Sequence, residues 1–197
     1  MNQLAPADLR IERRRAALLV VDVQERLAAV MAPGDLAILE QNLLLLLELA
    51  HRTGLPVVVS EQNPGGLGPT IPALRSWLAE GGRAVERVEK MTFACTDDPG
   101  FLELHRRLGR TQWIVAGLET HICVYQTVRG LRALGSLVHV PADAVLSRAP
   151  ANVHAGLRLV EQAGGIVTVT EAVIYDVLER AGTDEFRALV KRIKLVK

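Results

Sequence analysis

The chain has 197 residues, of which 49% are hydrophobic and 23% charged, and its formal net charge is +1 at pH 7. A chain of this length buries roughly 70% of its unfolded surface, so we expect a single domain over residues 1–197. The near-zero charge gives no electrostatic reason to expect a nucleic acid as partner, and the arginine run at 13–15 is typical of a solvated flank. The longest apolar stretch, 43–47 with its neighbours, is too short to cross a membrane.

The cysteines and the N-terminal segment indicate the compartment. Residues 1–11 are polar and lack an apolar core of signal-peptide length. Disulfides persist mainly in oxidising compartments, so we expect Cys95 and Cys123 to be free thiols. The sequence thus predicts a soluble, cytoplasmic protein with no membrane partner.

Short apolar runs alternate along the chain with longer segments of helical periodicity. The runs predicted as strands are 16–21, 56–60, 83–88, 112–116, 137–140 and 166–170. The segments predicted as helices are 36–52, 73–79, 98–108, one around residue 123 that continues to about 134, 152–162, 172–180 and 184–193. This alternation predicts an α/β fold, a three-layer sandwich in which helices cover both faces of a six-stranded parallel sheet.

Three polar or reactive side chains stand at or just beyond the carboxyl ends of predicted strands, where open α/β sheets bind their ligands. They are Asp22 after the first strand, Lys90 after the third and Cys123 after the fourth. Asp22 is predicted to act as a general base, with a helix N-cap as the alternative. Lys90 is predicted to lower the pKa of the thiol and to hold Asp22, with an ordinary solvated lysine as the alternative.

Cys123 is the predicted nucleophile because an apolar strand breaks at Gly117 and restarts as a helix around it. Free N–H groups and the helix dipole in a first turn favour the thiolate over the thiol. Cys95 lies in a polar turn and is interpreted as structural. His121 could pair with Cys123, but we rank it behind Asp22 because adjacency in sequence does not give hydrogen-bond geometry.

Motifs for metals and cofactors do not occur in the sequence. It contains no CxxC, no HExxH and no ligand spacing among its five histidines. It also contains no GxGxxG, and the glycines of 65–68 are not followed by the Lys-Ser or Lys-Thr of a phosphate loop. We therefore expect no metal and no cofactor, and a substrate loop at 65–68.

Four pieces of the chain resemble, in the right order, the isochorismatase-like cysteine hydrolase superfamily. They are LVVDVQ at 19–24, EK at 89–90, GLETHICV at 117–124 and DAVLSR at 143–148. The third piece and the loop EQNPGGLGPT at 61–70 resemble the branch called isochorismatase domain-containing proteins. The resemblance implies a triad of Asp22, Lys90 and Cys123, and it also implies a homo-oligomer.

The resemblance further implies a non-proline cis peptide bond between Leu118 and Glu119. This bond would aim the backbone N–H groups of Glu119 and Cys123 at one point as an oxyanion hole. Nicotinamidases of the superfamily hold a metal through Asp-x-His, whereas residues 60–63 here read SEQN, so no metal is expected. Isochorismatases hydrolyse a vinyl ether without a nucleophilic cysteine, so the presence of Cys123 argues against that reaction.

The sequence and the resemblance together predict a metal-independent cysteine hydrolase that takes a small amide or a related acyl compound through a thioester. A small-molecule substrate is the expected partner. The residues predicted to bind it are Gln24, for which a surface role is the alternative, and Glu61, Gln62, Trp77 and His121. Two other functions stay open: a scaffold that keeps the fold without turnover, and a redox-active thiol protein with Cys95 as the resolving cysteine.

Overall fold

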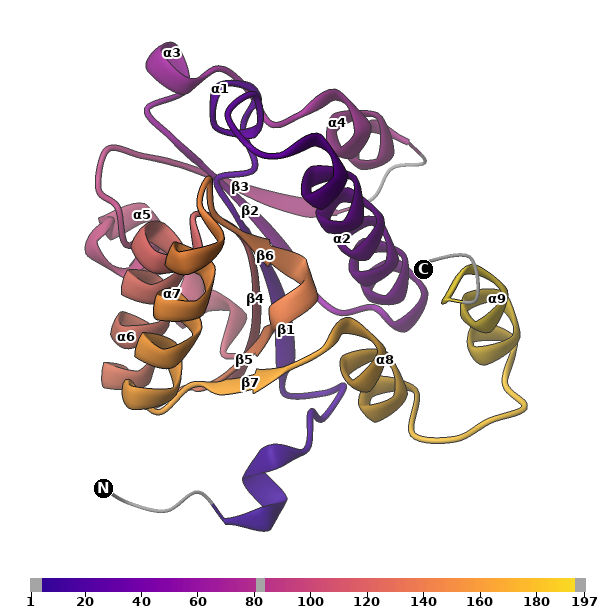
Figure 1. Cartoon of the computed structure of the whole chain (residues 1–197). Coiled ribbons are helices and arrows are strands. Elements are labelled where there is room, and N and C mark those ends of the chain that lie inside the picture. Colours follow the sequence, from indigo (N-terminus) through magenta and orange to yellow (C-terminus); the bar gives the residue numbers. More distant parts are fainter. Residues whose placement is uncertain (1–4, 81–83, 194–197) are drawn as a thin grey trace.

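The computed structural model describes residues 5–80 and 84–193 and contains one parallel sheet (Figure 1). The strand order is β3-β2-β1-β4-β5-β7, and β6 pairs with β4 beside β5. The strands are β1 (Ala16–Val21), β2 (Val57–Gln62), β3 (Val85–Lys90), β4 (Gln112–Leu118), β5 (Leu137–Pro141), β6 (Val145–Leu146) and β7 (Ile166–Thr168).

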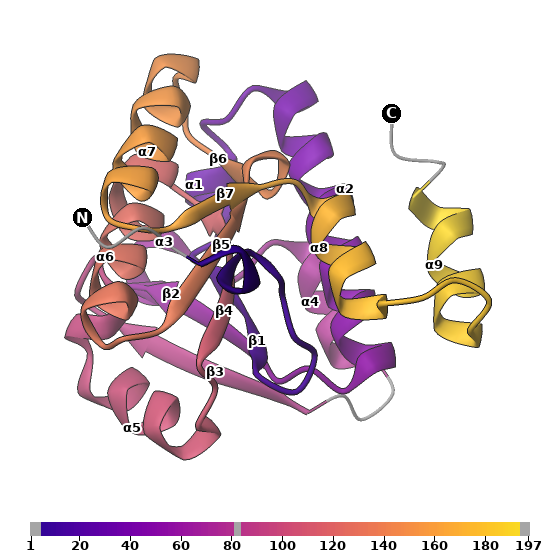
Figure 2. The same cartoon turned by 90° about the horizontal axis from the view of Figure 1, so that it is seen from below.

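Helices cover both faces of this sheet (Figures 1 and 2). One face carries α2 (Pro33–Thr53), α4 (Pro72–Ala79), α8 (Thr170–Leu178) and α9 (Asp184–Ile193). The other face carries α5 (Pro99–Leu108), α6 (Tyr125–Ala133) and α7 (Pro150–Gln162). The shorter helices are η1 (Pro6–Leu9), α1 (Glu25–Ala28), α3 (Pro64–Leu67), η2 (Cys95–Asp97), η3 (Thr120–Val124) and η4 (Ala142–Ala144).

Side chains of the central strands alternate between two apolar cores, one on each face of the sheet. Leu18 and Val20 of β1 join the core beneath α2, whereas Leu19 and Val21 join the core beneath α5, α6 and α7. All six residues of β1 are buried, as expected for a central parallel strand covered on both faces. The predicted three-layer α/β fold is thus confirmed.

The sheet has one strand more than predicted. The additional strand, β6, has two residues, too few for any periodicity to indicate it. β2, β3 and β4 each end two residues later than predicted, and residue 83, the predicted start of the third strand, lies outside the described residues. Three helices begin earlier than predicted, each with a proline at its first position: Pro33, Pro72 and Pro150.

Because the strands are parallel, their carboxyl ends lie at one edge of the sheet. Val21 at the end of β1 pairs with Ser60 of β2 and with Gly117 of β4. On the far side of β2, Gln62 pairs with Lys90, the last residue of β3. The ends of β3, β2, β1 and β4 therefore form the floor of the candidate site.

Candidate active site

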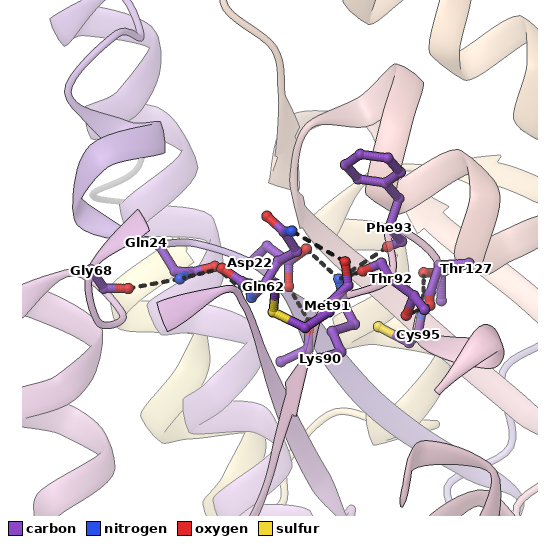
Figure 3. Close-up of polar contacts among 12 residues, drawn as sticks. Asp22, Gln24, Gln62, Gly68, Lys90, Met91, Thr92, Phe93, Cys95 and Thr127 are labelled. Atoms are coloured by element: carbon purple, nitrogen blue, oxygen red, sulfur yellow. Dashed lines mark hydrogen bonds and ion pairs between the residues drawn. The ribbon is translucent and has the colours of Figure 1, made fainter. Parts of the chain in front are cut away.

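A buried ion pair joins the carboxyl ends of β1 and β3. Lys90 Nζ lies 2.7 Å from Asp22 Oδ2, and both side chains are fully buried. The same nitrogen donates to the backbone carbonyls of Thr92 at 3.1 Å and Phe93 at 3.0 Å (Figure 3). An ammonium has three N–H donors, so all of those on Lys90 are in use. Lys90 is therefore a buried partner of Asp22 and not a solvated lysine.

Asp22 lies between β1 and α1 in a left-handed backbone conformation, with φ of 50°. The N-cap alternative is wrong, because α1 begins at Glu25 and its N-cap is Gln24. The Asp22 carboxylate instead accepts a second hydrogen bond, from Ser60 Oγ to Oδ1 at 2.7 Å. A left-handed non-glycine residue costs of order 1–3 kcal/mol, and such residues cluster at functional sites.

The nucleophile candidate, Cys123, lies in η3, a π-helical turn that follows β4, and the residue is 7% exposed. Burial raises the pKa of this thiol, the charge of Asp22 raises it further, and the charge of Lys90 offsets only part of the rise. The thiol also shares a hydrogen bond with the Asp22 carboxylate, which favours the protonated form.

The prediction of a resting thiolate is therefore wrong. The charge of Lys90 is paired with Asp22, so the thiol faces a neutral pair and not a free cation. The helix predicted around Cys123 begins as the π-helical turn η3 and continues as the α-helix α6 from Tyr125. The structure thus brings Asp22, Lys90 and Cys123 together as predicted, but these surroundings raise the pKa of the thiol.

Cys95 lies beside the same ion pair, a position that the sequence does not reveal. It is fully buried, and its backbone N–H donates to Thr127 Oγ1 at 3.0 Å. Burial raises its pKa to about 11, against the lowering effect of the Lys90 charge. Cys95 and Cys123 are both free thiols, as expected.

The predicted cis peptide bond is wrong, since Leu118–Glu119 is trans like every other peptide bond of the described residues. The chain instead turns from β4 into η3 with trans peptide bonds throughout. Gly117 adopts a φ of 121°, and η3 then makes a turn wider than an α-helix. Glu119 between them is extended, with φ of −85° and ψ of 143°.

The segment after β6 holds η3 in place. Arg148 donates to the buried Glu119 carboxylate through its backbone N and Nη2, each at 3.0 Å, and through Nε at 3.3 Å. His121 Nδ1 lies 3.1 Å from Ser147 Oγ. The Glu119 side chain and this nitrogen of His121 are thus engaged with residues 147–148.

Gln24 and Glu61, predicted to bind substrate, hold the loop between β2 and α4. Gln24 is fully buried; its Nε2 donates to Gln62 O at 3.0 Å and Gly68 O at 2.7 Å, and its Oε1 accepts from Gln62 N at 2.7 Å. Glu61 Oε1 accepts from both the backbone N and the hydroxyl of Thr70, at 2.7 and 2.6 Å. The side chain of Gln62 reaches Met91 O at 3.4 Å above the ion pair (Figure 3).

Trp77 is the one predicted site residue that the structure does not bring to the triad. Its ring makes an edge contact with His51 at a centroid distance of 6.2 Å. It lines a cavity of about 390 Å³ together with Pro56, Val57 and Val85, at the amino ends of β2 and β3. Asp22 and Lys90 lie at the carboxyl ends, on the opposite edge of the sheet.

The described residues contain no group of three or more His, Cys, Asp or Glu side chains arranged to hold a metal ion. None of the helices in the described ranges combines the length and the apolar character needed to span a membrane.

Comparison with known proteins identifies the family of this fold. A model of the isochorismatase domain matches residues 16–172. Isochorismatase domain-containing protein 2 of Xenopus laevis is 28% identical to this chain, over 93% of it and 86% of the frog protein.

Two solved structures share the fold. The structure described as MAR1 ribonuclease from Caenorhabditis elegans is 32% identical, with a TM-score of 0.82 over 94% of this chain and 92% of the nematode chain. The YcaC gene product of Escherichia coli, described as an octameric hydrolase of unknown specificity, is 21% identical, with a TM-score of 0.81 over 99% and 91% of the two chains. The chain therefore belongs to the isochorismatase-like hydrolase superfamily, in the branch of the isochorismatase domain-containing proteins.

Proposed function

We propose that the chain is a metal-independent cysteine hydrolase of a small amide or a related acyl compound. The observation that carries the proposal is the fully buried Lys90–Asp22 pair with the Cys123 thiol hydrogen-bonded to its carboxylate. A carboxylate beside a protonated thiol is the arrangement that general-base activation of a nucleophile requires.

The first half of the reaction forms a thioester. Asp22 accepts the thiol proton while Cys123 Sγ attacks the carbonyl carbon, which gives a tetrahedral oxyanion. The intermediate then collapses, the carbon–nitrogen bond breaks, and Asp22 gives the proton to the leaving amine. Lys90 stays paired with Asp22 throughout and compensates its charge.

The second half releases the acid. Asp22 takes a proton from water as the water oxygen attacks the thioester carbonyl. Collapse of this second intermediate frees the carboxylic acid, and the proton returns to the sulfur of Cys123. The enzyme thereby regains its protonated resting thiol.

The carboxylates around the thiol already have protein partners, which supports chemistry without a metal. Asp22 accepts from Lys90 and Ser60, and Glu61 accepts twice from Thr70, so a cation would have to displace these donors. Two free thiols support a cytoplasmic location. The octameric relative from Escherichia coli supports a homo-oligomer, which light scattering of the purified protein would measure.

The test is hydrolysis of a panel of small amides, followed by release of ammonia or amine. For the amide that is turned over, Cys123→Ala and Asp22→Asn should each lower kcat by at least about a thousandfold, because nucleophile and base act as one unit. Circular dichroism should show the same fold in both variants. In the wild-type protein, acid quenching during turnover should trap the acyl group on Cys123, visible as a mass increase of that peptide.

Two outcomes would contradict the proposal. Undiminished hydrolysis by Cys123→Ala would exclude the covalent mechanism. RNA should also be assayed, because a structural neighbour is described as a ribonuclease. Cleavage of RNA that depends on Cys123, without hydrolysis of any amide, would replace the amidase proposal.

A further inference from the structure

The Lys90–Asp22 ion pair crosses the end of β2, which lies between the two strands that carry these residues. Neighbouring strands are about 4.8 Å apart, so the lysine side chain must span roughly two strand spacings. Ser60 is the residue of β2 at this level, since it pairs with Val21, the residue before Asp22. Ser60 therefore lies on β2 between the two strands that the ion pair joins.

Ser60 makes two contacts with Asp22. Its backbone carbonyl accepts from Asp22 N at 3.1 Å, and its hydroxyl donates to Asp22 Oδ1 at 2.7 Å. A serine hydroxyl carries one proton, so that proton is committed to the carboxylate. Both residues are 0% exposed, so water does not compete for the bond.

The two oxygens of the Asp22 carboxylate thus have separate donors on either side. Lys90 holds Oδ2 and Ser60 holds Oδ1, which fixes the plane of the carboxylate.

We propose that Ser60 is a positioning residue for the reaction: it fixes the Asp22 carboxylate toward the Cys123 thiol and is small enough for Lys90 to pass over β2. This inference rests on the proposed function, because it assigns Asp22 the role of base. Ser60 acts through Asp22 and touches no substrate.

Three substitutions of Ser60 distinguish the effect of its hydroxyl group from the effect of its side-chain volume. Ser60→Thr keeps the hydroxyl, Ser60→Val has the shape of threonine without it, and Ser60→Ala removes it without adding bulk. Charge-assisted hydrogen bonds are stronger than neutral ones, so Ser60→Ala and Ser60→Val should lower kcat at least about tenfold, with KM within about twofold. Ser60→Thr should stay within about threefold of wild type.

A buried hydroxyl far from the triad provides the control. Thr53 is 4% exposed and donates to Leu49 O at 2.6 Å within α2. Thr53→Val should leave kcat and KM unchanged, even where it lowers the melting temperature. The inference would be overturned by full kcat in Ser60→Ala, or by Ser60→Thr losing as much activity as Ser60→Val.

A second measurement needs no substrate. The pH dependence of iodoacetamide labelling of Cys123, quantified by peptide mass spectrometry, reports the pKa of this thiol. Asp22→Asn should shift the profile to lower pH, because it removes a charge that raises the pKa of the thiol. Ser60→Ala should shift the profile in the same direction, because the carboxylate is no longer held toward the thiol, and Ser60→Thr should restore it. A wild-type profile in Asp22→Asn would show that the carboxylate does not act on the thiol, and the proposed function would fail with it. A shifted profile in Asp22→Asn together with a wild-type profile in Ser60→Ala would overturn the role of Ser60 alone.

Discussion

Removal of the buried Lys90 side chain should lower the free energy of unfolding strongly, because the Asp22 carboxylate would remain buried without its partner. Taking one member from a buried ion pair typically costs 3–5 kcal/mol, since the other charge is left uncompensated. The Asp22–Lys90 pair has no exposed surface on either side chain. Lys90 and Asp22 therefore contribute to stability only when both are present, because either charge alone would be buried without a partner.

We predict that Lys90→Met lowers the free energy of unfolding by about 3–5 kcal/mol, because it strands the Asp22 charge. Adding Asp22→Asn to it should recover part of that loss. Urea denaturation of the two single variants and the double variant measures the coupling. As a control, Arg106→Met breaks a pair with Glu103 in which both side chains are exposed, and should cost less than about 1 kcal/mol. Additive losses in the double variant would contradict the prediction.

Single residues were predictable from the sequence where a strand end was visible. Asp22, Lys90 and Cys123 each follow a predicted strand, and the edge of a parallel sheet brings such residues together. Ser60 also ends a predicted strand, but serine is so common at strand ends that its type gave no signal. Trp77 was wrongly expected at the site, because helical periodicity does not tell which end of the sheet a residue of α4 faces.

At the level of elements, the turn from β4 into η3 depends on the absence of a side chain at Gly117. Its φ is 121°, and a Cβ built on it would lie 2.1 Å from the carbonyl oxygen of Val21. β4 and β1 therefore approach each other at this point more closely than any other residue type permits. This close approach lies directly before Asp22 in one segment and before the turn η3, which carries Cys123, in the other.

Gly117→Ala should therefore lower stability by at least about 3 kcal/mol, because backbone atoms must shift to admit the methyl group. Gly135 is the matched comparison: its φ of 83° is also left-handed, yet nothing lies within 4 Å of a Cβ there. Gly135→Ala should cost only about 1 kcal/mol. Chemical denaturation of both variants checks the difference, and equal losses would show that the approach to Val21 is unimportant.

Elements with clear periodicity were predicted well, and those set by tertiary contact were not. The helices after Pro33, Pro72 and Pro150 were found within three residues, since an apolar stripe indicates them. β6 has two residues and pairs with β4 only because the chain after β5 returns to the sheet. The π-helical turn η3 was predicted as α-helix, because the same apolar spacing fits both.

At the level of the whole molecule, one buried histidine links stability to pH. His139 of β5 is 1% exposed, and its Nε2 has no hydrogen-bond partner among the described residues. Burial lowers its pKa from 6.5 to about 4, while the charge of Asp176 raises it and that of Arg132 lowers it. Between these values the unfolded chain binds a proton that the folded chain does not.

Stability should therefore fall as the pH drops from about 6.5 to about 4, with a contribution from His139 of roughly 3 kcal/mol at the acid end. His139→Leu removes the titrating group. As the pH falls over this range, the free energy of unfolding of the wild type should therefore decrease relative to that of the variant. Urea unfolding at pH 7, 5.5 and 4 measures it. Parallel pH curves for the two proteins would mean that His139 does not titrate in this way.

The reach of the Lys90–Asp22 pair across 68 residues of sequence has a consequence for how the protein is made. During synthesis, Asp22 emerges from the ribosome before Lys90, the residue that compensates its charge, and Cys123 emerges after both. Until β3 is added beside β2, the carboxylate must stay in water. A nascent chain that ends before Cys123 lacks one of the three residues of the proposed triad, so that triad can be completed only after β4 has been synthesised.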